Sequence, residues 1–255
     1  MNLVLRKQSD HLKSNRKEIL MYSLFSSAAG ALPLPVLDEW FASAARRKVV
    51  RSIAKNRSVD TNKDAIEMMA DGASPPPAWN KLLRVGMLFK LALKQWRKFL
   101  IAVLAAQKIQ EASKTFCILT CFDHYCAKHH VGLGLDSDSA KALRLTIEQA
   151  IKETPGGLSR SLFKKGLSGT AHAMLSGPKN LFSRFSKFLD QGGKETPEHL
   201  EVEVVDDKNP HATGDELHGF DKVASGLEHQ FSPIDNAYLE ALIAHFDKLH
   251  TSKNK

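Results

Sequence analysis

The stretch ILMYSLFSSAAGALPLPVL, residues 19–37, contains no charged side chain and carries a Pro33-Leu34-Pro35 break near its end. A helix needs about 20 apolar residues to cross a membrane, so length alone permits insertion. Its three serines lower the apolarity, and proline bends or ends a helix. Three structures remain open: a buried helix ending near Leu32, a shallow membrane hairpin with the prolines at its tip, or a cleaved signal.

The flanks of this stretch bear on the signal alternative. Basic residues precede it, and residues 29–31 have the A-x-A form of a cleavage site. Asp10 and Glu18, however, lie in what would be the basic leader. The three cysteines lie between residues 117 and 126, and an odd number leaves a free thiol in a secreted protein. A reducing compartment fits them best, so we expect a cytoplasmic protein, peripheral at the inner membrane if it meets one.

Residues 38–55, which follow the break, predict an amphipathic helix. Apolar side chains recur at three- and four-residue spacing from Trp40 to Ala54, and cations occupy most of the other positions. Asp38 and Glu39 at the start complement the helix dipole. The basic face of this helix is a candidate surface for anionic lipid headgroups or for a protein partner.

A pattern of known type covers residues 24–59. An apolar helix rich in small residues is followed by LPLPVLD at 32–38, and then by a helix with Arg51, Ile53 and Ala54. This pattern resembles the EcsC-like and GTPase-associated helical domains of bacteria, whose molecular activity is poorly defined. The resemblance implies an all-α, membrane-associated domain, and it carries no catalytic residue over to this chain.

The charge of the chain is unevenly distributed. Of its 255 residues 43% are hydrophobic, which is enough for a substantial core. Residues 1–189 hold 30 Lys/Arg and 14 Asp/Glu, a net charge of +16, and residues 190–255 hold 6 and 14, a net charge of −8. A basic body attracts anionic surfaces. Among anionic partners, nucleic acid is not favoured by the sequence criteria, because aromatic residues make up only 7% of the chain and no nucleic-acid-binding module is recognised.

Hydrophobic periodicity predicts an all-α fold: a multi-helix bundle with a flexible acidic segment and a C-terminal amphipathic helix. The predicted parts are a basic helical body over residues 1–190, the acidic segment over 191–231 and the helix over 232–255. Within the body, the longest amphipathic pattern covers residues 79–130 and a short helix covers 61–71.

The segment CILTCFDHYCAKHH, residues 117–130, gathers residue types that bind metal. Zinc selects thiolate and imidazole ligands, and Cys117, Cys121 and His124 fall on one helical stripe. At 1.5 Å per residue the outer two lie about 10 Å apart along the axis, too far for one ion. We therefore predict Cys121, His124 and His129 as candidate metal ligands. The alternative is a structural role, as buried thiols and imidazoles at a helix C-terminus.

Motifs of the common enzyme classes are absent from the sequence. It has no nucleotide-binding loop, H-E-x-x-H, G-x-S-x-G or G-x-G-x-x-G, so no cofactor is predicted. We predict a non-enzymatic helical protein that is peripheral at a membrane or acts as a scaffold. The alternatives are a soluble bundle that binds a protein partner and, third, a metal-dependent enzyme. The predicted membrane- or partner-binding residues are Pro33, Pro35, Trp40, Arg46, Arg47, Lys48, Lys94, Arg97 and Lys98.

Overall fold

A computed structural model describes residues 10–29, 37–72, 86–130, 132, 134–175, 224–232 and 236–253. Within these residues the protein is all-α, which confirms the predicted fold class. The elements are η1 Asp10–Leu12, α2 Lys13–Ala29, α3 Leu37–Asn56, α4 Lys63–Asp71, α6 Gly86–Lys128, α7 Ser137–Glu153, α8 Arg160–Leu175, η2 Glu228–Phe231 and α11 Ala237–Lys253. No described helix combines the length and the apolarity that crossing a bilayer requires.

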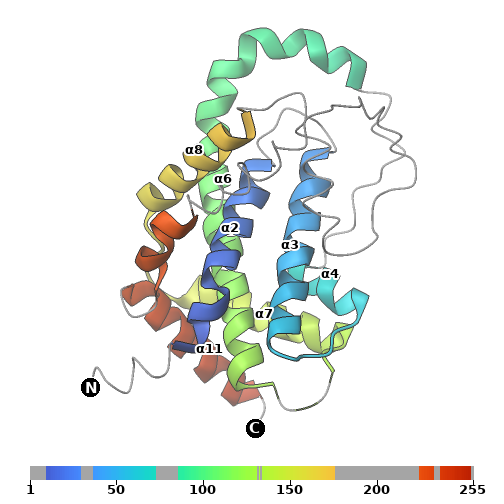
Figure 1. Cartoon of the computed structure of the whole chain (residues 1–255), viewed down its shortest axis with the longest axis vertical. Coiled ribbons are helices and arrows are strands. Elements are labelled where there is room, and N and C mark those ends of the chain that lie inside the picture. Colours follow the sequence, from blue (N-terminus) through green and yellow to red (C-terminus); the bar gives the residue numbers. More distant parts are fainter. Residues whose placement is uncertain are drawn as a thin grey trace, which may run out of the picture.

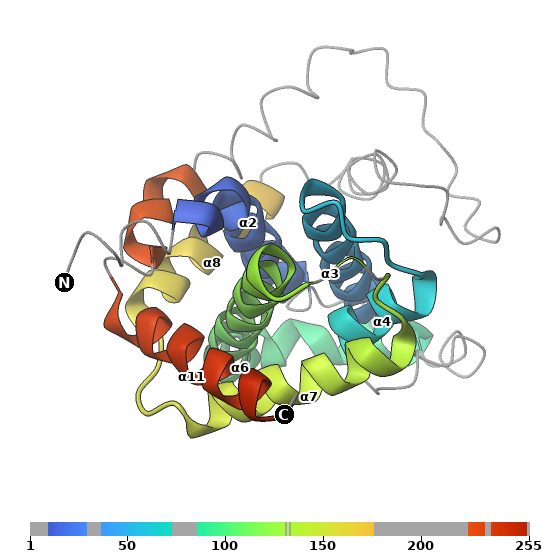
Figure 2. The ribbon, with the colours of Figure 1, turned by 90° about the horizontal axis from the view of Figure 1, so that it is seen from below.

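The C-terminal half of α6 is the axis around which the other helices pack. α2 lies along α6 and contacts α3 and α8, while α4 joins α3 to α7 (Figure 1). α7 and α11 lie across the end of the bundle where α6 finishes, and both contact it (Figure 2). The N-terminal part of α6 extends past the bundle at the opposite end. This arrangement brings the last turns of α6 against the C-terminal helix.

The uncharged stretch begins as a core helix. From residue 19 to residue 28 all side chains but one are buried. The hydroxyl of Ser23 donates to the carbonyl of Ile19 at 2.7 Å, so this buried polar group keeps a hydrogen-bond partner. Of the three alternatives, the structure therefore has the buried helix, which is α2. Residues 30–36, including the two prolines, lie outside the described residues.

Three phenylalanines from distant parts of the chain meet in the core. The rings of Phe116 in α6 and Phe163 in α8 lie 6.2 Å apart, and Phe231 in η2 lies 5.0 and 4.9 Å from them. Full burial of such a ring contributes about 2–3 kcal/mol to the free energy of folding. Phe231 belongs to the predicted flexible acidic segment, 191–231. The last part of that predicted segment, from residue 224, is therefore not flexible: it packs in the bundle through the buried side chains of Ala224, Leu227 and Phe231.

The C-terminal helix predicted over residues 232–255 is present as α11. It begins later than predicted, after Asn236, whose side chain accepts a hydrogen bond from the backbone N–H of Leu239 at 3.2 Å. Leu239, Leu242 and Phe246 are completely buried, so one face of α11 is docked on the bundle. The polar edge of this docked face carries the side chain that completes the site described next.

Candidate metal site between the long helix and the C-terminal helix

The end of α6 positions two histidines. His124 lies in the last turns of the helix and is 1% exposed. His129 follows the final residue, and the backbone N–H groups of His129 and His130 both donate to the carbonyl of Tyr125, at 2.8 and 3.0 Å. Gly132 then takes a φ of 62°, which favours glycine, and the chain turns away. These hydrogen bonds hold the His129 imidazole beside that of His124.

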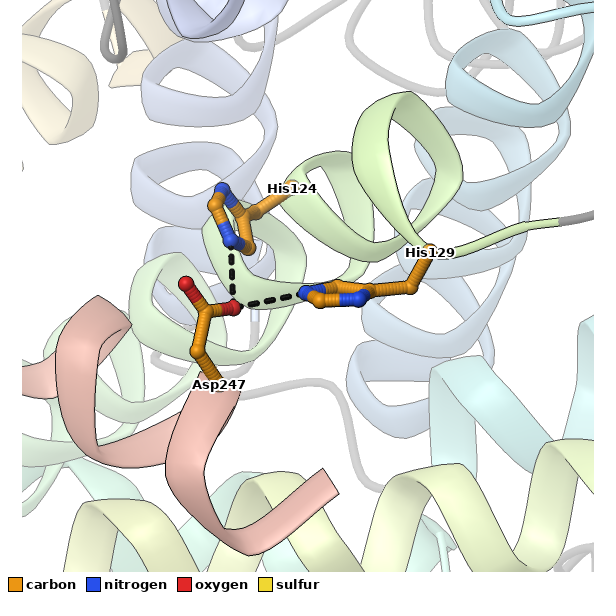
Figure 3. A group of neighbouring side chains, drawn as sticks. All are labelled: His124, His129 and Asp247. Carbon is orange, nitrogen blue, oxygen red and sulfur yellow. Dashed lines mark hydrogen bonds and ion pairs between the residues drawn. The ribbon is translucent and has the colours of Figure 1, made fainter. Parts of the chain in front are cut away.

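Asp247 on α11 lies between the two imidazoles. Its Oδ1 atom lies 2.7 Å from Nε2 of His124 and 2.7 Å from Nε2 of His129 (Figure 3). Each of the three residues offers one atom that could bind a metal ion, and these three atoms all lie within 4.8 Å of one another. The three side chains come from α6, from the residue directly after it and from α11, and they converge on one point, which is an arrangement that a metal ion could bridge.

A second layer of aromatic side chains fixes the two imidazoles. Nε2 of His11 lies 3.1 Å from Nδ1 of His124, the ring nitrogen that does not face Asp247. The Phe246 ring meets both imidazoles edge-on, with centroids 6.2 and 6.1 Å away. His250 stacks on Phe246 at 5.8 Å. The rings are therefore oriented by contacts on the side away from the carboxylate.

The electrostatics of the cluster favour an ionised carboxylate and neutral outer histidines. Burial raises the pKa of Asp247, but hydrogen bonds from His124 and His129 outweigh it and hold the pKa at about 2. Burial, and then the nearby His124, lowers the pKa of His11 to about 4. Burial, and then His129, also lowers the pKa of His250. At neutral pH the cluster thus holds one ionised carboxylate against both Nε2 atoms, with neutral His11 and His250 beside it.

A buried ion pair anchors α6 one residue before His124. Asp123 is completely buried and accepts from Nε and Nη2 of Arg57 at 2.7 and 3.0 Å. Asn15 of α2 donates to the same carboxylate at 2.7 Å. Arg57 also donates to the backbone carbonyl of His11. This network ties η1, α2 and the turn after α3 to α6 and so sets the positions of His11 and His124.

Two of the three metal ligands predicted from the sequence lie next to each other in the structure. His124 and His129 lie together, while Cys121 is not in the group of atoms around Asp247. Cys121 is completely buried, and burial raises its thiol pKa well above the ordinary value, which disfavours the thiolate that binds metal. Asp247, the third member of the group, lies 118 residues from His129 and is not among the ligands predicted from the sequence. The one signal was its place in AHFDKLH, between His245 and His250.

Two of the cations predicted to bind a membrane or a partner are held in ion pairs. Arg46 donates to Asp71 at 2.7 Å, and Arg47 donates to Asp71 at 2.9 Å and to Glu67 at 3.0 Å. Lys48 lies with its ammonium 5.8 Å from the centre of the Tyr22 ring. The side chains of Trp40, Lys94, Arg97 and Lys98 lie outside the described residues, as do Pro33 and Pro35.

Comparisons with protein-family models, curated proteins and solved structures found no match for this chain. The resemblance of residues 24–59 to the EcsC-like and GTPase-associated helical domains therefore stays a prediction.

Proposed function

We propose that this protein binds one divalent transition-metal ion, with zinc as the first choice, through His124, His129 and Asp247. In this proposal the ion fastens α11 to the end of α6. The observation that supports it is the convergence of two imidazole nitrogens and one carboxylate oxygen, with both N···O distances at 2.7 Å. Two histidines and one carboxylate form a donor set that zinc and related ions accept.

The spacing of the donor atoms suits an ion after a small adjustment. Around a tetrahedral zinc ion, with bonds of about 2.0 Å, neighbouring donor atoms lie about 3.3 Å apart. The N···O distances would therefore open by about 0.6 Å, and the two nitrogens, which lie within 4.8 Å of each other, would close by up to about 1.5 Å; side-chain rotations can supply both changes. Asp247 is 35% and His129 23% exposed, so water can reach the remaining coordination position. The ion would replace the imidazole protons that now face the carboxylate, so binding would release protons.

The outer contacts support metal binding as well. A ligating histidine usually places its other ring nitrogen against a hydrogen-bonding partner, which sets the tautomer. His11 provides that partner for Nδ1 of His124 at 3.1 Å. Because His11 is neutral at pH 7, its Nε2 can accept the Nδ1 proton and leave Nε2 of His124 free to bind the ion.

Zinc titration of tag-free, full-length protein tests this proposal. We expect calorimetry to give one site per chain, and a rise in thermal midpoint of about 5–10 °C at roughly 100 times the dissociation constant. His129→Ala and Asp247→Asn should abolish both effects. His245→Ala is the matched control, because its ring lies on α11 but contacts Thr154 and Glu153 instead. Zinc binding that is equal in all four proteins would overturn the proposal.

A second candidate function, a peripheral membrane or scaffolding role, is supported by the charge distribution. The excess of cations in residues 1–189 favours an anionic surface, such as the inner face of a bacterial membrane. With Arg46 and Arg47 paired to Asp71, we assign the attraction to exposed cations such as Lys164 and Lys165 on α8. The alternative within this class is a protein partner bound by the same basic surface.

Flotation with liposomes tests the second candidate. We expect the protein to float with anionic vesicles at low salt, to be released by high salt, and to float poorly with neutral vesicles. Lys164→Glu combined with Lys165→Glu should weaken flotation, while Lys152→Glu, which removes an exposed lysine from α7, should matter less. Failure to float with any vesicle would remove the membrane role and leave a protein partner.

A further inference from the structure

A polar cavity of about 220 Å³ is lined by residues of α2, α3, α4, α6 and α7. Four of its lining side chains are cations and two are carboxylates: Arg46, Lys108, Lys114, Arg144, Asp71 and Glu111. Apolar groups of Met69, Ile118 and Leu119 line another part of the wall. The cavity belongs neither to the histidine cluster nor to the ion pair of Asp123.

Among the residues that the structure describes, the ion pairs around this cavity do not give every cation a carboxylate of its own. Lys108 pairs with Glu111 at 2.7 Å. Arg144 and Lys114, in contrast, share a single carboxylate, that of Glu148, at 3.2 and 3.1 Å. Within the described part of the chain, the excess of positive charge therefore lies at Arg144 and Lys114, two cations that share one ion-pair partner.

Arg144 is the more enclosed of these two cations. Its side chain is 12% exposed, and besides Glu148 it donates to the backbone carbonyl of Met69. Burial lowers the pKa of this guanidinium and the nearby Arg46 adds to the lowering, although the carboxylates of Glu148 and Asp71 both favour the charged form. A further anion in the cavity would stabilise the charged guanidinium.

We propose that this cavity binds a phosphate group, either as inorganic phosphate or as the phosphate of a small organic ester, with Arg144 and Lys114 as its cationic ligands. Arginine presents a planar set of N–H donors that suits oxyanions, and lysine adds a mobile charge. The threonine hydroxyl of Thr115 lines the same cavity as a further donor. The apolar wall of Met69, Ile118 and Leu119 would contact the organic part of an ester.

Calorimetry with inorganic phosphate and with phenyl phosphate tests this proposal on the full-length protein. EDTA is kept in the buffer so that the metal site does not contribute, and chloride is adjusted to constant ionic strength. We expect saturable binding at one site per chain. Tighter binding of phenyl phosphate would identify an ester as the ligand, and equal binding would identify phosphate itself.

Lys114→Gln is the decisive variant, because the side chain is 54% exposed and its loss should not impair folding. Removal of a charge-assisted hydrogen bond should weaken phosphate binding about tenfold. Lys141→Gln is the matched control, an exposed lysine on α7 that does not line the cavity, and should bind as the unchanged protein does. Absence of saturable binding, or equal weakening in both variants, would overturn the proposal.

Discussion

At the scale of single residues, buried charges determine how the bundle is held together. Asp123 is completely buried beside Arg57, whose side chain is 17% exposed. A buried carboxylate without its partner is strongly destabilising, because its desolvation is no longer repaid. Hydrogen bonding to Asp123 outweighs burial and raises the pKa of Arg57. The Arg57 guanidinium thus stays charged beside the Asp123 carboxylate.

Arg57→Ala should lower the free energy of unfolding by about 3 kcal/mol, because it leaves Asp123 buried and unpaired. Urea denaturation followed by circular dichroism measures the change. Lys55→Ala is the control, since this exposed side chain lies two residues away and its removal should cost less than about 0.5 kcal/mol. An equal loss in the two variants would show that the buried pair has no special role.

Asp71 gives the protein a defined sensitivity to acid. Burial raises the pKa of Asp71, but Arg46, Ser43 and Arg47 outweigh it and leave the pKa below its ordinary value. A carboxyl whose pKa is depressed in the folded state contributes stability above its unfolded pKa, near 4, and loses it as the pH falls further. We therefore expect the thermal midpoint of the unchanged protein to decrease as the pH is lowered below about 4.

Asp71→Asn should cost about 1–2 kcal/mol at pH 7 and should flatten the dependence of stability on pH between about 4 and 2. Thermal melts at a series of pH values measure both effects. Asp64→Asn, an exposed carboxylate in the first turn of α4, serves as the control. A variant at Asp71 whose acid dependence matched that of the unchanged protein would contradict the assignment.

At the scale of elements, a glycine sets how closely α8 approaches α2. A Cβ atom at Gly166 would lie 2.8 and 2.9 Å from the two terminal methyl groups of Leu24. Leu24 is 1% exposed and lies in the packed core, so it has little room to move. Helix propensity alone would favour alanine over glycine by about 1 kcal/mol, but overpacking of a core costs about 1–3 kcal/mol.

Gly166→Ala should therefore destabilise the protein by about 1 kcal/mol, which corresponds to a drop of about 2–4 °C in thermal midpoint. Differential scanning calorimetry measures it. Gly157→Ala is the control, because nothing lies within 4 Å of a Cβ at that position. A stabilising effect at Gly166 would mean that α8 and α2 can separate without loss.

The docking of α11 should depend on the bound ion. Its buried side chains Leu239, Leu242 and Phe246 hold it to the bundle, and the proposed ion adds a bond to α6 at Asp247. We expect zinc to slow amide hydrogen exchange in α11 about tenfold or more, and EDTA to reverse the effect. Asp247→Asn should remove the response to zinc. Slowing confined to other helices would place the ion elsewhere.

At the scale of the whole molecule, local patterns predict the helices but not which of them meet. The periodicity of residues 38–55 and 79–130 was sufficient for α3 and α6. The burial of α2 could not be decided from sequence, because an apolar run with serines suits a core and a membrane equally. Asp247 was missed for the same reason: only the packing of α11 on α6 brings it to the histidines.

The measurement that tests the metal site most directly is zinc X-ray absorption on protein loaded with one equivalent of the ion. We predict a first shell of nitrogen and oxygen at about 2.0–2.1 Å, with the outer-shell scattering of two imidazoles and no sulfur. Asp247→Asn should reduce the bound zinc or change the shell. A zinc–sulfur distance of about 2.3 Å would contradict this site and would point to Cys121, the ligand that the sequence pattern favoured.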